Sequence, residues 1–172
     1  MEFYTVLKER HSVRAFKSAE VESGKIERIV ESATLAPSAG NLQSYKIYIV
    51  KKESVKEEIA RACYDQEFIA EAPVVFVFSG DRERAAGKYE ERGYEIYAVQ
   101  DATIAAAYAQ LAATAEGLGS VWVGAFDPLE ISRILNLPSY FVPVAVIPVG
   151  YPAEKPSPRE RRPLKEMVKE IR

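Results

Sequence analysis

Residues 100–116 most restrict how this chain can fold, because alanines occupy nearly every face of a helix drawn through them. Alanine has the highest intrinsic helix propensity, and a helix that is apolar all round is typically buried in the protein interior. Gly117 and Gly119 follow directly and are suited to end the helix. The segment therefore predicts a long, buried helix whose small side chains permit close packing against another helix.

The remaining segments predict strands and amphipathic helices in mixed order. Strands are expected at 45–50, 73–78, 121–126 and 142–150. The continuous apolar run at 73–78 is typical of a central strand, whereas the prolines within 142–150 indicate an edge strand or irregular pairing. Further helices are expected over residues 2–9, after an N-cap at Ser23, after a capping box of Ser54 and Glu57, and after Asp127 as N-cap with Pro128 at the first helical position. This mixture, without an internal repeat or a linker, indicates a single α+β domain.

Residues 81–97 allow two interpretations. The segment is charged and rich in tyrosine, and it contains Gly87 and Gly93. A solvated helix or loop is the first interpretation, and a mobile cover over a ligand is the second. The sequence leaves both open.

The composition narrows the class of protein. The chain has 172 residues, 48% of them hydrophobic, so it is long enough for one domain with a full core. The net charge of −2 and the pI of about 5.6 argue against nucleic acid as a main partner. No apolar run approaches the roughly 18 residues that span a membrane, and charges near the N-terminus interrupt any signal-peptide core. We therefore expect a cytoplasmic protein that binds neither nucleic acid nor membranes.

One cysteine and one histidine limit the available chemistry. Cys63 alone cannot form an intrachain disulfide or a cysteine-based metal site. His11 alone argues against a histidine zinc site and against a Ser-His-Asp triad. We therefore expect no metal site and no side chain that acts as a nucleophile.

Cations crowd the two ends of the chain. Arg10, His11, Ser12 and Arg14 lie near the N-terminus, and Arg159, Arg161 and Arg162 lie near the C-terminus. Between them, residues 36–43 form a turn-rich stretch that carries amide side chains and no charge. Because arginine presents a planar fork of donors to phosphate oxygens, the pattern suits a ligand with a phosphate at one end and a hydrogen-bonding ring at the other. Solvated surface cations and a simple connecting loop are the alternative.

Seven motifs in order along nearly the whole chain resemble the nitroreductase family, the FMN-dependent NAD(P)H oxidoreductases, in its short form. They occupy residues 10–16, 36–43, 72–75, 101–102, 117–127, 148–152 and 159–164. The loop departs from the family pattern at Ser44, where a proline usually stands. The resemblance implies a mostly antiparallel central sheet flanked by helices.

The resemblance also implies a role for individual residues. Arg10, His11 and Ser12 are expected to contact the FMN phosphate and ribityl chain, with Arg159 and Arg161 completing the phosphate site. Arg14 is expected near the pyrimidine end of the flavin, and Gln66 nearby. Val123, Gly124 and Ala125 are expected along the flavin edge, with the Gly124 amide near N5. Pro37, Ser38, Ala39 and Asn41 are expected to come from the second subunit of a homodimer.

The expected protein is thus one FMN-binding domain over residues 1–172, whose extension at 151–172 wraps the partner subunit. Hydride is expected to pass from NADH or NADPH through flavin N5 to a small-molecule acceptor such as a nitroaromatic or a quinone, both substrates using one site in turn. The cofactor performs this chemistry, so no catalytic side chain is expected. Dehalogenation or flavin fragmentation on the same scaffold, and a non-catalytic anion-binding dimer, stay open as alternatives.

Overall fold

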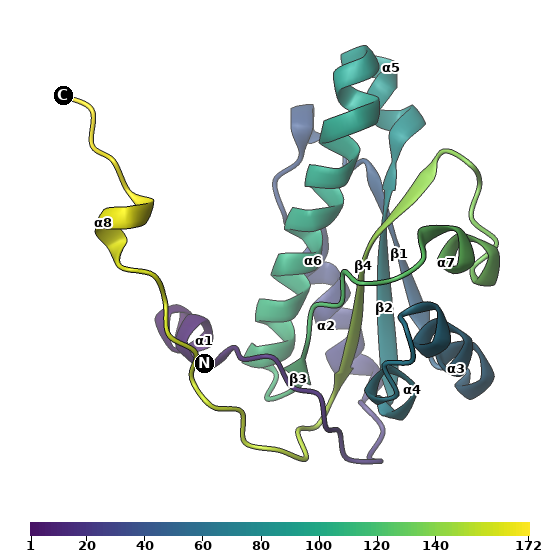
Figure 1. Ribbon diagram of the computed structural model, residues 1–172, viewed down its shortest axis with the longest axis vertical. Coiled ribbons are helices and arrows are strands. Elements are labelled where there is room, and N and C mark those ends of the chain that lie inside the picture. The colour runs from purple at the N-terminus through teal and green to yellow at the C-terminus, as the bar shows by residue number, and fades with distance from the viewer.

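A four-stranded sheet lies at the centre of the computed structural model, which describes all 172 residues (Figure 1). The strands are β1 (Tyr45–Val50), β2 (Val74–Asp81), β3 (Gly119–Ser120) and β4 (Phe141–Gly150). Their order across the sheet is β1-β2-β4-β3, and each neighbouring pair is antiparallel. The expected α+β fold with a mostly antiparallel sheet is therefore confirmed.

Helices cover both faces of this sheet. They are α1 (Phe3–Glu9), α2 (Ser23–Thr34), α3 (Glu53–Ala62), α4 (Phe68–Glu71), α5 (Arg82–Arg92), α6 (Ala98–Ala115), α7 (Pro128–Ile134) and α8 (Leu164–Met167), with a 3-10 turn η1 (Ala39–Asn41) and a π-helical turn η2 (Gly93–Tyr97). None of these helices combines the length and the apolar character that a membrane crossing requires.

Strand β2 divides the core in two because its side chains alternate between the faces of the sheet. Phe76 and Phe78 join the cluster under α2 and α6. Val75 and Val77 join the second cluster, which α3, α4 and α7 cover. All four side chains are buried, which confirms the prediction of a central strand at 73–78.

Helix α6 is the long buried helix that its alanines predict. Ala102, Ala105, Ala106 and Ala113 are fully buried, and the helix packs against α2 and β2. It begins at Ala98, two residues earlier than expected, because η2 leads into it without a break. The alanine face lets the backbones of the two helices approach closely over the sheet.

Two strand predictions need correction. β4 is interior, because β2 and β3 pair with its two sides. Its pairing is irregular as expected, since the register shifts between Phe78 and Ser79, opposite Pro143. The strand expected at 121–126 is wrong: only Gly119–Ser120 joins β4 as a strand, and beyond it Val123 forms a single bridge to Val146 as the chain leaves toward α7.

Two helix starts also differ from expectation. α3 begins at Glu53, with Lys52 as its N-cap, so Ser54 does not cap it. α2 begins at Ser23 itself, after Glu22. The prediction for α7 is confirmed, because the Asp127 carboxylate accepts hydrogen bonds from Leu129 and Glu130 and Pro128 starts the helix.

The chain beyond Gly150 leaves the body of the molecule. The Tyr151 carbonyl accepts a hydrogen bond from Lys17, and the Ala153 amide donates to Ala15, so this part runs beside the N-terminal segment. Residues 157–172 are exposed, and in Figure 1 they extend away from the sheet with α8 as a single turn. We call residues 151–172 the C-terminal arm.

Candidate functional site

The N-terminal cations are carried by an extended segment that follows α1. The Arg10 amide closes the helix on Val6, and Val13 then donates to the Ser120 carbonyl at the edge of the sheet. Val13 is buried, whereas Ser12 and Arg14 on either side are exposed. The alternation of an extended chain therefore turns Ser12 and Arg14 outward while Val13 anchors the segment.

The arm forms the opposite wall of the site. The Glu154 carboxylate accepts hydrogen bonds from the backbone amides of Arg14, at 2.5 Å, and Ala15, at 3.2 Å. This contact holds the root of the arm against the N-terminal segment. It brings Arg159 and Arg161 to the side chains that follow α1, across more than 140 residues of sequence.

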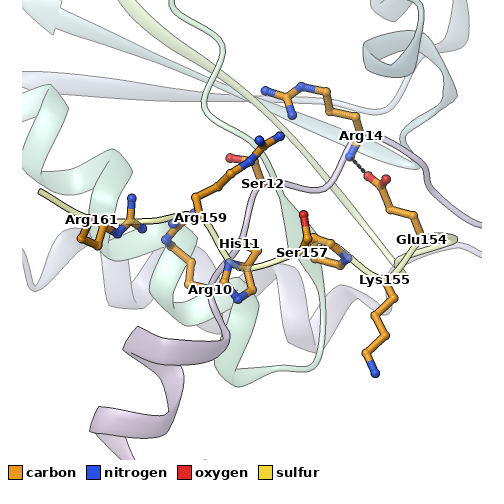
Figure 2. Close-up of a pocket in the computed structure, with 10 residues that line it drawn as sticks. Arg10, His11, Ser12, Arg14, Glu154, Lys155, Ser157, Arg159 and Arg161 are labelled. Carbon is orange, nitrogen blue, oxygen red and sulfur yellow. Dashed lines mark hydrogen bonds between the residues drawn. The ribbon is translucent and has the colours of Figure 1, made fainter.

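Between these walls lies a cavity of about 390 Å³, which we call the cationic pocket. It is lined by Arg10, His11, Ser12, Arg14, Glu154, Lys155, Pro156, Ser157, Arg159 and Arg161. Figure 2 shows the side chain of Arg159 running toward Ser12 and that of Arg10 pointing toward Arg161, whereas the side chain of Lys155 points away. The structure thus brings together the six terminal residues expected at one site, and Arg162 instead pairs with Glu166.

The charges in the cationic pocket are unbalanced. Arg10, Arg14, Arg159 and Arg161 form no ion pair within the chain, and Glu154 is the one carboxylate in the lining. Converging guanidinium groups without acidic partners repel one another, and a phosphate dianion relieves this repulsion while accepting their hydrogen bonds. The donor set therefore fits the phosphate end of a ligand such as FMN.

A second group of expected residues lies around α4 and the chain after β3. The Gln66 amide donates to the carbonyls of Cys63, at 2.8 Å, and Ala125, at 3.3 Å, which ties it to the 123–125 segment. Val123 is buried, while Gly124 and Ala125 are exposed and leave their backbone accessible. These residues do not line the cationic pocket, so they form a separate part of the candidate site.

The loop residues expected from a second subunit lie elsewhere. Ala39 contacts Asp101 in the first turn of α6, and Gly40 faces Lys88 and Tyr89 of α5. In Figure 1, α5 stands at the end of the molecule opposite α1 and the root of the arm. Pro37, Ser38, Ala39 and Asn41 therefore do not reach the pocket of their own chain.

Three contributions are missed by sequence reasoning. Glu154 and Ser157 line the cationic pocket, and nothing in the proline-rich arm distinguishes them from solvated residues. Asp101 holds the loop between Ala39 and Ser44, and the sequence marks it only as the start of a long helix and as part of the motif at 101–102. Each depends on a contact between segments far apart in the chain.

The lone cysteine has no part in this chemistry. Cys63 is fully buried beneath α3, and burial raises the pKa of its thiol to about 12. The thiol is therefore protonated at neutral pH, and a protonated thiol is a poor nucleophile.

Comparison with known proteins gives a consistent result. The model of the nitroreductase family matches residues 7–67 and 60–151. A Thermus thermophilus protein named NADH dehydrogenase is 33% identical over 191 positions, covering 95% of this chain and 93% of that protein. A Bacillus subtilis protein named FMN reductase, with NAD(P)H in its name, is 30% identical over 170 residues, covering 91% of this chain and 68% of its own.

One solved structure extends the comparison to three dimensions. An FMN-dependent nitroreductase from Clostridium difficile superposes with a TM-score of 0.78 at 28% identity, and 90% of each chain is covered.

Proposed function

Since the chain belongs to the nitroreductase family, we propose that it is an oxidoreductase that binds FMN in the cationic pocket and takes electrons from NADH or NADPH. The observation that carries the proposal is the meeting of four unpaired guanidinium groups in one cavity built by both ends of the chain. The names of the relatives support the same cofactor and electron donors.

FMN, when bound, supplies a ring that accepts a hydride at N5 and passes the electrons to an oxidised small molecule. A nitroaromatic or a quinone is the acceptor class that we propose. The nicotinamide and the acceptor would use the same site in turn.

The protein binds and orients the cofactor. Arg10, Arg159 and Arg161 would bind the phosphate, and His11 and Ser12 would bind the phosphate and the adjoining ribityl chain. A charge-assisted hydrogen bond contributes roughly 1.5–3 kcal/mol to such binding. Because the three arginines come from two segments that Glu154 joins, phosphate binding also holds the arm in place.

The remaining residues act on the ring. Arg14 places a positive charge near the pyrimidine end, where reduction adds negative charge. The exposed backbone of Gly124 offers an amide to N5, between Val123 and Ala125, and Gln66 holds this segment through its bond to the Ala125 carbonyl. Fixed donors and charges of this kind stabilise a developing charge without reorganisation.

A homodimer completes this arrangement. Pro37, Ser38, Ala39 and Asn41 lie at the far end of their own chain, so they serve the site only if a second copy presents them. The arm also exposes apolar side chains that a partner subunit would cover: Leu164 is 74% exposed and Ile171 is 79% exposed. A groove of about 420 Å³, lined mainly by apolar residues of α1 and α6 such as Phe3 and Tyr108, offers them a docking surface.

Colour and reduction test the proposal. The purified protein should be yellow, heat should release FMN at one per chain, and NADH or NADPH should bleach the spectrum without oxygen. A panel of nitroaromatics, quinones and halogenated aromatics then identifies the acceptor class and separates reduction from dehalogenation. A protein that binds phosphate but no flavin would instead be an anion-binding dimer, and recovery of FAD would contradict the choice of cofactor. The cytoplasmic location stays a prediction.

A further inference from the structure

The loop from Ser38 to Ser44, which we call the 38–44 loop, contains left-handed backbone conformations that residues with a side chain rarely adopt. Gly40, Asn41 and Gln43 have φ values of 55°, 58° and 46°. Left-handed conformations are disfavoured for residues with a Cβ atom and persist where the surrounding structure imposes them. Hydrogen bonds within the loop support this backbone, such as the one from the Gln43 amide to the Ser38 hydroxyl at 3.0 Å, and contacts from outside the loop hold its ends.

Asp101 supplies the main restraint. Its side chain is only 2% exposed, and its two oxygens accept hydrogen bonds from both ends of the loop. Oδ1 binds the Ala39 amide at 2.8 Å, and Oδ2 binds the Ser44 amide at 3.2 Å. One buried carboxylate thus spans the whole loop and fixes the distance between its ends.

The Asp101 carboxylate forms no other hydrogen bond within the chain. Asp101 forms no ion pair, and its place in the first turn of α6 compensates part of the desolvation of its charge through the helix dipole. The Ser44 hydroxyl is buried without a hydrogen-bond partner, so it does not share this work. The carboxylate is committed to two backbone amides of the loop.

Helix α5 covers the loop from the other side. The Arg84 guanidinium donates to the Leu42 carbonyl at 2.5 Å, and Gly40 lies against the ends of Lys88 and Tyr89. Segment 81–97, for which a solvated element and a mobile cover are the alternatives, forms α5, which is interrupted at Glu90, followed by η2, and the first turns of α5 rest on this loop. The loop is held between α5 and α6, with Asn41 left exposed.

We propose that Asp101 is a positioning residue for the flavin site of the other subunit, an inference that rests on the proposed function. By bracketing the loop, its carboxylate sets the orientation in which Ser38, Ala39 and Asn41 are presented to the second copy. Asp101 touches neither the cationic pocket of its own chain nor the reacting atoms, so it acts through the loop alone.

Replacement of Asp101 by asparagine tests this role directly, because the amide keeps the shape of the side chain but turns one acceptor into a donor. D101N should weaken FMN binding by roughly tenfold or more, because FMN binding must then supply the free energy that the charge-assisted hydrogen bond to the loop supplies in the parent. E116Q is the matched control: Glu116 follows the other end of α6, where its carboxylate binds Arg28. The E116Q variant should bind FMN with the affinity of the parent protein.

Hydrogen exchange of the flavin-free protein gives a readout that needs no cofactor. The amides of residues 38–44 should exchange faster in D101N than in the parent or in E116Q, while those of β2 stay protected. Unchanged exchange in the loop would overturn the positioning role. A parent protein that binds no flavin would overturn the proposed function instead, even if the loop exchanges as expected.

Mixed dimers separate positioning across the interface from general destabilisation. A D101N subunit is combined with a subunit that carries R10A and R159A, each with its own tag. If Asp101 serves the partner's site, the arginines of the D101N subunit meet the intact loop of its partner, and that site is unaltered. The other site combines the substituted arginines with the D101N loop. One FMN should then bind per dimer. Mixed dimers without FMN would contradict action in the partner's site, because each site would then carry one defect.

A second variant keeps the test informative if D101N folds poorly. Arg84 is exposed, so R84A removes the outer restraint on Leu42 without opening the core. R84A should speed exchange within the loop and weaken FMN binding by less than D101N does. Tight binding together with unchanged exchange in R84A would count against a loop held from both sides.

Discussion

In the cationic pocket, four guanidinium groups lie at the surface without an acidic partner, whereas in the 38–44 loop one buried carboxylate holds two backbone amides. The walls of the pocket are charged but held together by few contacts, because Glu154 alone joins the arm beyond Ala153 to the N-terminal segment. The loop is held by hydrogen bonds with Asp101 and Arg84, but none of its own side chains is charged. We therefore propose that the first region supplies affinity for the cofactor and that the second fixes the geometry of its contacts.

In the proposed homodimer, this difference would divide binding of the phosphate and positioning of the ring between two copies of the chain. Cations on extended segments bind a phosphate strongly even if they move, since electrostatic attraction tolerates small displacements. Hydrogen bonds to a flavin ring require fixed donors and acceptors, and the loop that we propose for this role is held by contacts from α5 and α6. Mutations in the two regions should consequently fail in different ways.

Truncation after Gly150 should have the largest effect, because it removes Glu154, Arg159 and Arg161 together with the apolar residues of α8. We expect a colourless protein that is monomeric or aggregated, as measured by absorbance and light scattering. The 38–44 loop should keep its hydrogen-exchange protection in any folded fraction. A yellow dimer after truncation would mean that the arm has neither a structural nor a phosphate-binding role.

Arg10→Ala should weaken FMN binding about ten- to a hundredfold, which corresponds to roughly 1.5–3 kcal/mol for a charge-assisted hydrogen bond. Thermal stability of the flavin-free protein should not fall, because Arg10 has no acidic partner within the chain. Fluorescence titration with FMN measures the affinity. Arg162→Ala is the control, since Arg162 pairs with Glu166 outside the pocket, and equal losses in both variants would contradict a specific site.

Arg14→Ala should alter the reduction potential of bound FMN more than its retention. Loss of a positive charge near the pyrimidine end destabilises the negatively charged reduced ring. A loss of about 1.4 kcal/mol would lower the two-electron potential by roughly 30 mV. Redox titration against a reference dye measures this shift, and an unchanged or higher potential would argue that Arg14 lies elsewhere.

Gly40→Ala should have the smallest effect on FMN binding, because it should alter only the conformation of the 38–44 loop. At a φ of 55° an alanine is disfavoured by about 1 kcal/mol, and its Cβ would displace the ends of Lys88 and Tyr89. We expect a lower melting temperature and a small loss of FMN affinity. Gly87→Ala, at a helix position with open space around it, is the control. A Gly40→Ala protein as stable as the parent would show that the loop tolerates change.

The sequence by itself determined the features that depend on local pattern or on residue type. The alanines of 100–116 specify a helix that must be buried, and the apolar run at 73–78 specifies a central strand, because helix and strand periodicity act over a few residues. The family resemblance rests likewise on short motifs, and it places cations at both chain ends, which the structure then brings to one pocket.

Only the tertiary structure decided how distant segments meet. Residues 121–126 have strand composition, yet only Gly119–Ser120 forms a strand beside β4, with one further bridge at Val123, because the chain turns toward α7. The prolines of β4 suggest either an edge or irregular pairing, and the structure has the second, because a register shift accommodates Pro143 within the sheet. Glu154 and Asp101 gain their roles from backbone amides 139 and 57 or more residues away. A carboxylate in a sequence does not reveal which amide it will meet, because the packing of the whole chain sets that distance.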